Sequence, residues 1–396
     1  MHSVMAFLGE DEQEKALVLD NGSATVKAGF SGDDAPCVEF PSIIGRPRLP
    51  PQKGLKGLMV GCGVHFLVGD QAYDKRGVLN IKYPIRSGVV SSWDDMEQIW
   101  HYTFYRKLRV APEEHPVLLT DCDLPFYPKA NREKLTQSMF ETFSVPAMYV
   151  AMQELLALYG SGSTTGVVVN LGHHVSHTVS FHNMRVLQKS IRRVDIGGDI
   201  LTSHMMKIME ESGYRFTTTT DRDVAQEIKE KLTYVAMDFG AEIKKYEENS
   251  EGNKSYALPD GQTITIGNQQ FRCPEALFDT SVVRPKAECL HHMLHRCIKQ
   301  QTDTREGCTI AQNLYGNIVL VGGSSLFPGL QNRLTKELAM LAPPTMKVKV
   351  VAHPDRKYFP WIGGSIMASM ADFQSSWITK DEFEDIGPSV VHRKCM

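Results

Sequence analysis

Two stretches of the chain share one pattern: KALVLDNGSATVKAGF at Lys15–Phe30 and GVVVNLGHHVSHTVSF at Gly166–Phe181. Each reads as an apolar strand, a tight turn of polar residues and glycine, and a second strand in which apolar and polar residues alternate. The first strands end at Asp20 and Asn170, at equivalent positions of the pattern. The copies lie about 150 residues apart, which indicates two duplicated halves.

Glycine follows the polar residue by two positions in both copies, at Gly22 and Gly172. We expect these glycines to adopt positive φ and to let backbone N–H groups approach an anion. A single D-N-G-S turn is also an ordinary β-hairpin turn and carries little weight alone. Two such hairpins facing each other would clamp a polyphosphate, so the pair favours a phosphate site.

A third glycine-rich element lies near the C-terminus, in NIVLVGGSSLFPGL at Asn317–Leu330. An apolar strand runs into Gly322 and Gly323 and then into a helix, which places backbone dipoles and a flat glycine surface beside a ligand. The Walker A pattern and the G-x-G-x-x-G dinucleotide fingerprint are both absent from the sequence.

The composition excludes several classes of protein. The 396 residues carry 43 Lys+Arg against 46 Asp+Glu, so no basic field indicates nucleic acid. No apolar run reaches the roughly 18 residues of a membrane-spanning helix, and the first residues do not resemble a signal peptide. The eight cysteines include no C-x-x-C pair. We therefore expect a soluble intracellular protein without membrane insertion, a disulfide framework or a structural zinc site.

Helical and strand signals alternate, which predicts an α/β fold. Helical periodicity is clear in five segments: Trp93–Leu108, Lys129–Thr142, Asp221–Phe239, Pro328–Ala342 and Trp361–Trp377. Three segments are read as surface connections: Arg46–Gly61 as a mobile loop, Lys244–Lys254 as a charged, solvated surface segment and Thr302–Asn313 as a polar connection.

Longer stretches resemble the actin and actin-related protein family nearly end to end. They include LDNGSATVKAGFSGDDAP, WDDMEQIWHYTFY, PKANREKLTQ, IKEKLTYVAMDF, DRKYFPWIGGSIMAS and GPSVVHRKCM. The resemblance implies one actin-like domain of the fold shared with sugar kinases and heat-shock chaperone ATPases, with two lobes around a nucleotide cleft. It divides residues 1–396 into subdomain 1 (1–41, 84–160, 359–396), subdomain 2 (42–83), subdomain 3 (161–196, 286–358) and subdomain 4 (197–285).

The resemblance also implies a site for ATP or ADP with Mg²⁺ or Ca²⁺. Ser23 and Lys27 would contact the phosphates, Asp20 would hold metal-bound waters, and Gln153 would position the attacking water. The other positions that match nucleotide contacts of the family are Gly172, His173, Gly198, Lys229, Glu230, Gly322, Gly323, Phe327 and Lys357.

The second phosphate turn departs from the family, which has D-S-G-D-G where this chain has Asn170-Leu171-Gly172-His173-His174. Asn170 lacks the charge that organises the metal's waters, and Leu171 lacks a hydroxyl for the γ-phosphate. Each lost charge-assisted hydrogen bond costs about 1.5–3 kcal/mol. We expect a weak or absent ATPase with reduced affinity, and a His173 whose pKa rises beside a polyphosphate. Loss of a site no longer used is the alternative.

Surfaces that make filament contacts in actin also differ. The loop between Arg48 and Gly69 is longer and contains Pro50, Pro51, Lys53 and Lys56, and a further insertion lies around Glu306–Gln312. The tip that is apolar in actin carries Arg284 and Lys286, whose unpaired burial would be costly. These changes predict altered polymerisation.

Other features concern partners. The resemblance places Tyr159, Ile366, Met367 and Met370 in an apolar cleft that accepts a helix of actin-binding proteins.

The acidic residues Glu10, Asp11, Glu12 and Glu14 are interpreted as a solvated terminus. The clusters His173-His174…His177 and His291-His292…His295, the second with Cys289 nearby, have metal-ligand spacing, but core or surface histidines are the favoured interpretation.

The sequence thus predicts a divergent actin-like cytoskeletal protein that binds adenine nucleotide with impaired hydrolysis. It would be cytoplasmic, with a nuclear pool as a further option, and its polymer partner would be a second copy or conventional actin. The alternative is a non-polymerising actin-related scaffold subunit of a larger complex. A third class, an active sugar kinase or chaperone ATPase, is supported by the phosphate hairpins alone and by no other stretch of the sequence.

Overall fold

A computed structural model describes residues 15–48, 66–122, 125, 127–249, 252–258, 261–300 and 305–395. The acidic residues Glu10, Asp11, Glu12 and Glu14 lie outside the described residues, as do those of the Arg48–Gly69 loop from position 49 to 65, which include Pro50, Pro51, Lys53 and Lys56.

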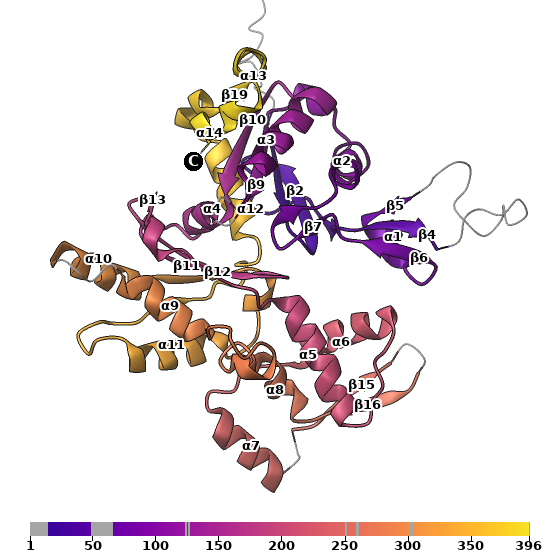
Figure 1. The fold of residues 1–396 in the computed structure, drawn as a ribbon, viewed down its shortest axis with the longest axis vertical. Coiled ribbons are helices and arrows are strands. Elements are labelled where there is room, and N and C mark those ends of the chain that lie inside the picture. The colour runs from indigo at the N-terminus through magenta and orange to yellow at the C-terminus, as the bar shows by residue number, and fades with distance from the viewer. Residues whose placement is uncertain are drawn as a thin grey trace, which may run out of the picture.

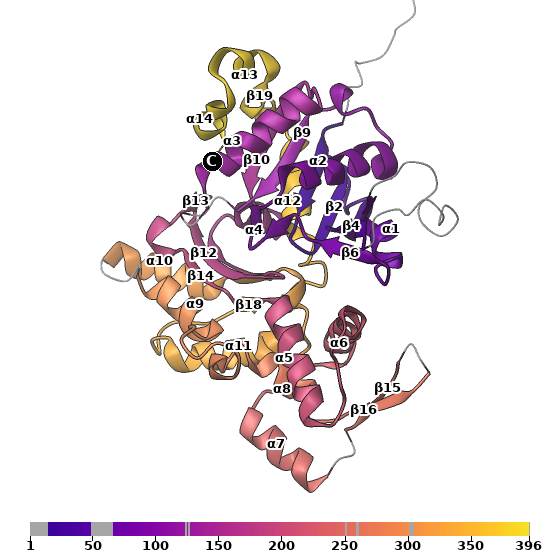
Figure 2. The same cartoon turned by 45° about the vertical axis from the view of Figure 1, so that its right-hand side comes forward.

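Two sheets form the centres of two halves of the molecule (Figures 1 and 2). The first has the order β19-β10-β9-β1-β2-β3, with β1 (Leu17–Asn21), β2 (Thr25–Phe30), β3 (Val38–Pro41), β9 (Val117–Asp121), β10 (Ala147–Met152) and β19 (Ile378–Thr379). The second has the order β13-β12-β11-β17-β18, with β11 (Gly166–Leu171), β12 (Ser176–His182), β13 (Arg185–Val186), β17 (Ile318–Val321) and β18 (Val350–Val351), and β14 (Arg192–Val194) pairs with β12.

The same topology occurs in both sheets. An antiparallel hairpin, β1–β2 or β11–β12, is followed by two strands that continue the sheet in parallel from its first strand. Asp20 pairs in register with Lys27, and Asn170 pairs with His177. The structure therefore confirms the duplicated α/β architecture.

Helices cover both sheets. Those of the first half are α2 (Trp93–His101), α3 (Lys129–Gln137), α4 (Gln153–Gly160), α12 (Phe359–Ala368), α13 (Lys380–Ile386) and α14 (Val391–Lys394). Those of the second are α5 (Gly198–Glu211), α6 (Thr219–Leu232), α7 (Phe239–Glu248), α8 (Gln269–Glu275), α9 (Leu290–Lys299), α10 (Arg305–Gly316) and α11 (Leu330–Leu341). The C-terminal helices α12 to α14 return to the first half, beside the N-terminal sheet (Figure 1).

Smaller elements extend from each half. In the first, α1 (Gly69–Asp74) lies on the sheet of β4 (Ile44–Pro47), β5 (Leu67–Val68) and β6 (Leu79–Lys82), and β7 (Ile85–Arg86) pairs with β8 (Val89–Val90). In the second, β15 (Lys254–Ala257) pairs with β16 (Thr263–Ile266). Among the described residues, no helix is long and apolar enough to cross a membrane.

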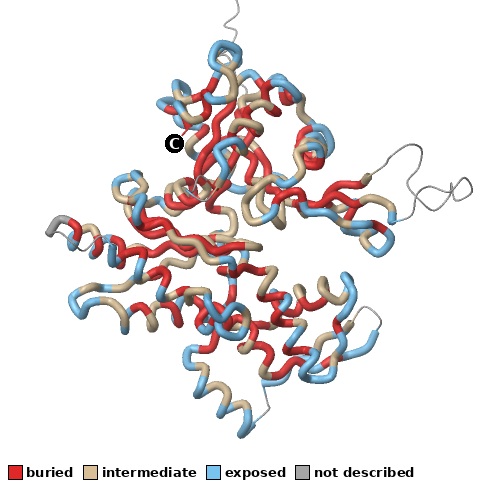
Figure 3. The backbone as a smooth tube through the Cα atoms, viewed as in Figure 1, coloured by how far each residue is buried: buried red, intermediate tan, exposed pale blue. Residues whose placement is uncertain are grey.

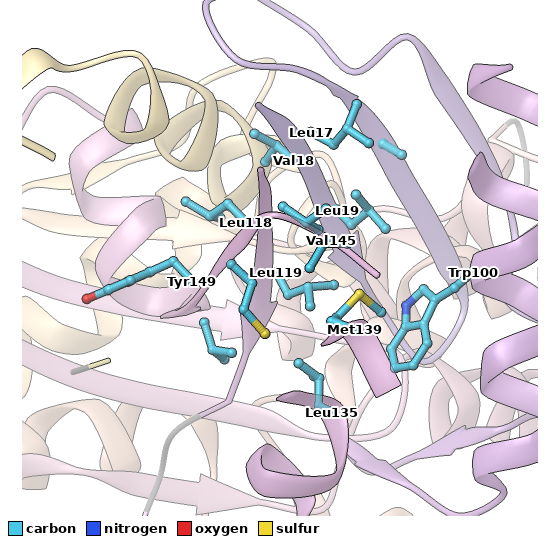
Figure 4. Packing of buried hydrophobic residues seen from close by; sticks show 14 of the residues in the cluster. Leu17, Val18, Leu19, Trp100, Leu118, Leu119, Leu135, Met139, Val145 and Tyr149 are labelled. Atoms are coloured by element: carbon cyan, nitrogen blue, oxygen red, sulfur yellow. The ribbon is translucent and has the colours of Figure 1, made fainter. Parts of the chain in front are cut away.

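The core of each half follows its sheet (Figure 3). Leu17, Val18 and Leu19 of β1 are wholly buried, and Figure 4 shows them packed with residues of neighbouring elements. Trp361 of α12 donates from Nε1 to the carbonyl of Val18 at 2.9 Å. A Cβ at Gly363 would lie 1.9 Å from the carbonyl oxygen of Leu156, so glycine is required where α12 crosses α4.

Most predicted helices are confirmed, although two continue with a different helical geometry. Trp93–Leu108 is α2 followed by a π-helix at Tyr102–Leu108, and Lys129–Thr142 is α3 followed by one at Ser138–Thr142. Pro328–Ala342 contains α11. Trp361–Trp377 is not one helix, because α12 ends at Ala368 and a 3₁₀ helix follows at Ala371–Ser376.

Two other predictions are wrong in part. The helix predicted at Asp221–Phe239 ends at Leu232, because the amides of Tyr234 and Val235 donate to the carbonyls of Gln270 and Pro328 instead of continuing the helix. The charged surface segment predicted at Lys244–Lys254 is confirmed for its described residues: it begins inside α7, and none of them is buried.

The predicted polar connection at Thr302–Asn313 is instead mostly helix α10. Its buried residues, Ala311, Leu314 and Tyr315, follow helical spacing at the end of the segment. The apolar stripe therefore lies mainly beyond the range that looked polar.

Candidate functional site: the cavity between the two hairpins

The turns of the β1–β2 and β11–β12 hairpins border one cavity of about 370 Å³, called here the central cavity. All the residues singled out from the sequence for nucleotide or metal contact line it: Asp20, Ser23, Lys27, Gln153, Asn170, Gly172, His173, Gly198, Lys229, Glu230, Gly322, Gly323, Phe327 and Lys357. They come from both halves of the chain. The structure brings them together, and their individual roles remain predictions.

The first hairpin holds a fixed carboxylate. Asp20 accepts hydrogen bonds from Lys27 Nζ at 2.7 Å, Thr120 Oγ1 at 2.7 Å and Gln153 Nε2 at 2.9 Å. Asp20 and Lys27 are both buried, so each depends on the other for charge compensation. Gln153 is thereby held at the start of α4, beside the carboxylate.

The second hairpin replaces this ion pair with neutral contacts. Asn170 Nδ2 donates to Oε1 of Glu154 at 3.2 Å, and Glu154 is wholly buried behind it at the start of α4. Burial raises the pKa of Glu154 to about 7. A carboxyl group thus lies beside the position where the resemblance predicts an aspartate, but it does not itself line the central cavity.

The turn glycines are required for a different reason from the one we expected. The expectation of positive φ at Gly22 and Gly172 is wrong, since neither has it. A Cβ at these residues would lie 2.8 Å from the carbonyl oxygen of Thr25 and 2.9 Å from that of Val175, respectively, so each turn is too tight for a side chain. Positive φ occurs at Gly322, at 86°.

Lys229 brings positive charge to the other wall. Its Nζ donates to Gly198 O and Thr202 Oγ1, both at 3.0 Å, while Glu230 Oε1 lies 4.0 Å away on an exposed side chain. Burial lowers the pKa of Lys229. A buried ammonium with mainly neutral partners favours an anionic ligand.

Two other predicted contacts have different surroundings. Lys357 pairs with Glu39 at 2.7 Å, so its charge is already partly compensated. Phe327 is buried, and nothing lies within 4 Å of a Cβ built at Gly323, which leaves open space along this wall.

His173 is not poised as an imidazolium by the protein's own groups. Burial, followed by repulsion from His174, lowers its pKa to about 4, against the attraction of Asp199 at 3.9 Å. The pKa of His173 can therefore rise as predicted only if a bound phosphate offsets this lowering. Half-protonation at pH 7 requires about 4 kcal/mol of favourable interaction between the phosphate and the imidazolium.

The donor set suits a polyphosphate better than a divalent metal. Asp20 is the carboxylate that could contact metal-bound water, and its oxygens already accept three hydrogen bonds. Asp121, the next acidic residue along the wall, pairs with Arg132 at 3.0 Å. Mg²⁺ often uses only one or two carboxylates with substrate phosphates. Asp20 can therefore act as a carboxylate for the metal's waters, although Asp121 is already engaged elsewhere.

The histidine clusters do not form metal sites as units. His291 stacks on Phe278, and His295 Nδ1 lies 2.8 Å from the hydroxyl of Tyr315, which fits the interpretation as packed histidines. His177 is separated from His173 and instead lies near Cys122 and Glu154, all three with ligand atoms within 4.8 Å of one another.

Other surfaces can also be located. Ile366 and Met370 are exposed, the hydroxyl of Tyr159 contacts Met370 Sδ at 2.9 Å, and Met367 packs partly against the core. Arg284 and Lys286 are exposed at the tip after α8.

The sequence did not predict Thr120, Cys122 or Glu154 as residues of the site. Their side chains come into contact with the predicted site residues only when the chain is folded. The signal available for Glu154 was its place directly after Gln153 at the start of a helix. That position alone does not reveal burial.

The family model described as Actin matches residues 11–396. The chain belongs to the actin family.

Proposed function

We propose that this actin-family protein binds adenine nucleotide in the central cavity and hydrolyses it slowly or not at all. The observation that carries the proposal is the pair of equivalent hairpin turns around one cavity, with buried Lys27 and Lys229 on its walls. An anionic nucleotide would compensate the positive charge that Lys229 brings into a buried place.

Each wall would have a distinct role in binding. Ser23, Gly172 and Lys27 would contact the phosphates, while Gly322, Gly323 and Phe327 would accept the nucleoside, together with Gly198, Lys229, Glu230 and Lys357. Mg²⁺ or Ca²⁺ would neutralise phosphate charge, and Asp20 would orient its waters. We expect reduced metal dependence because Asn170 contributes no charge.

Slow hydrolysis follows from the groups around Gln153. Its Nε2 donates to Asp20 and, at 3.2 Å, to Thr120, and its Oε1 accepts from Cys122 Sγ at 3.3 Å. The amide that would position water is thus engaged at both ends. Asn170 cannot accept the proton of an attacking water as a carboxylate does.

Binding is tested by calorimetric titration of ATP and ADP into the full chain, with Mg²⁺ and with EDTA, across pH 5.5–8.5. We expect saturable binding that falls by less than tenfold when the metal is removed. Undetectable binding under every condition would contradict the proposal and favour loss of an unused site.

Hydrolysis is tested by restoring the carboxylates. Asn170→Asp with His173→Asp is expected to raise phosphate release at least tenfold over the parent chain, since each charged hydrogen bond is worth about 1.5–3 kcal/mol. A double variant that binds Mg-ATP but stays inert would place the defect elsewhere. Asn313→Asp with Asn332→Asp, at two exposed positions on the same half, serves as the charge-matched control.

A non-polymerising scaffold subunit is the second candidate function, and the exposed Arg284 and Lys286 favour it. A filament contact that buried these cations without partners would be unfavourable. Sedimentation with Mg²⁺, salt and ATP decides: pelleting, alone or with conventional actin, supports a filament protein, and its absence in both cases supports the scaffold.

We further propose a cytoplasmic, cytoskeletal location, with a nuclear pool as an option, and partners that insert a helix beside Tyr159, Ile366, Met367 and Met370. The subdomain boundaries at 41/42, 83/84, 160/161, 196/197, 285/286 and 358/359 are part of the same proposal. Fluorescent tagging in cells, with Ile366→Asp as the cleft variant, would test location and partner binding.

A further inference from the structure

Cys122, Glu154 and His177, called here the Cys–Glu–His cluster, meet between the two halves of the molecule. Cys122 directly follows β9, Glu154 is the second residue of α4, and His177 lies in β12 of the other sheet. Their ligand atoms lie within 4.8 Å of one another, and their exposed fractions are 8%, 0% and 1%. Three metal-ligating side chains are thus buried together beside the central cavity, and the proposed function assigns none of them a contact with the nucleotide.

Glu154 is incompletely satisfied by the protein. Its Oε1 accepts from Asn170, but its buried Oε2 has no hydrogen-bond partner among the residues that the structure describes. Leaving such an acceptor unpaired is costly, more so if it is charged. This oxygen therefore has capacity for a ligand.

His177 is oriented as a ligand by an outer partner. Its Nε2 lies 3.1 Å from the hydroxyl oxygen of Tyr127, and its Nδ1 faces Glu154 Oε1 at 3.9 Å. When Nε2–H donates to Tyr127, the lone pair of Nδ1 points into the cluster. Metal-bound histidines usually have an outer partner of this kind.

The charge and chemistry of the donors select the ion. A thiolate and a carboxylate together neutralise a divalent cation, which removes the penalty for burying either anion alone. Burial raises the pKa of the Cys122 thiol well above its usual range, so without a cation this thiol stays protonated. Thiolate, imidazole and carboxylate suit Zn²⁺, whereas Mg²⁺ and Ca²⁺ prefer oxygen ligands alone.

We propose that Cys122, Glu154 and His177 bind one zinc ion through Sγ, a carboxylate oxygen and Nδ1, with a fourth ligand supplied from the central cavity. Cys122 and His177 line that cavity, so water or an anion can reach the open position. Tetrahedral zinc places its ligand atoms about 3.3–3.8 Å apart. The two ligand atoms of the cluster that lie farthest apart must therefore approach each other by about 1 Å.

Zinc binding would also act on Gln153. The thiol of Cys122 donates to Gln153 Oε1, and a metal-bound thiolate has no proton to donate. The amide oxygen of Gln153 would then be released, although the zinc site itself does not require nucleotide to bind.

The test uses the full chain, stripped with a chelator and without nucleotide. Zinc is titrated and counted by elemental analysis, and Co²⁺ is used as a spectroscopic probe. We expect one ion per chain and a thiolate-to-cobalt charge-transfer band. Cys122→Ser, which preserves shape, should abolish the band and weaken zinc binding more than about 100-fold, beyond the usual effect of losing an outer partner.

Glu154→Gln and His177→Gln should also weaken zinc binding, and circular dichroism would establish that each variant is folded. The matched controls are Cys297→Ser, at another buried thiol, and His295→Ala, in the second histidine cluster. Both should bind as the parent does. Absence of stoichiometric zinc in the parent would overturn the proposal. So would a result in which His295→Ala loses zinc binding while Cys122→Ser retains it.

Discussion

Replacing Glu154 by glutamine should change the pH dependence of stability in a defined direction. Glutamine has nearly the same shape and keeps an oxygen to accept from Asn170 Nδ2, as Glu154 Oε1 does at 3.2 Å. The substitution therefore removes the titrating proton with little change in packing. The remaining difference between parent and variant is the cost of ionising a wholly buried carboxyl group.

The magnitude follows from linkage. Burial raises the pKa of Glu154 from 4.5 to about 7, so the native state binds this proton more tightly than the unfolded state does. Its contribution to stability is therefore complete below pH 4.5 and is lost as the pH rises to about 7. The loss amounts to about 3 kcal/mol, because one pKa unit corresponds to about 1.4 kcal/mol.

The assay is urea unfolding of parent and variant from pH 5 to 8.5, in the presence of a chelator. At pH 5 Glu154→Gln should be more stable than the parent by less than about 1 kcal/mol, and above pH 7.5 by about 3 kcal/mol. Comparing the two chains cancels the titration of other groups, including His177, whose pKa burial lowers to about 4. Glu114→Gln, at an exposed site, is the control. Parallel pH profiles for parent and Glu154→Gln would refute the reasoning.

Three further predictions concern packing and charge. Gly363→Ala should destabilise the fold by about 3 kcal/mol or more in thermal unfolding, because its Cβ would overlap the backbone of Leu156. The control Gly316→Ala should have little effect, because open space surrounds that Cβ. Leu118→Ala should cost about 2–5 kcal/mol in urea unfolding, and a loss below 1 kcal/mol would contradict its place in the core. Lys229→Met should weaken ATP binding about 10- to 100-fold in calorimetry without lowering the thermal stability of the ligand-free chain; unchanged affinity would argue against a role for Lys229 in nucleotide binding.

The sequence by itself determined the duplicated hairpins and the family. Apolar strands that end at Asp20 and Asn170 make each hairpin recognisable locally, since strand periodicity and turn chemistry are properties of neighbouring residues. The same local rules failed at Thr302–Asn313, where the buried stripe of α10 begins late, and at Tyr234, whose backbone bonds to a distant segment.

The tertiary structure alone decided how the second turn is compensated. Asn170 looked like the loss of a charge, yet the fold places buried Glu154 against it and brings Cys122 and His177 to the same place from two other elements. Nothing in their spacing along the chain predicts this meeting. Burial and proximity also set the protonation of His173 and Glu154, because both depend on side chains and solvent exclusion that exist only once the two halves of the chain have packed together.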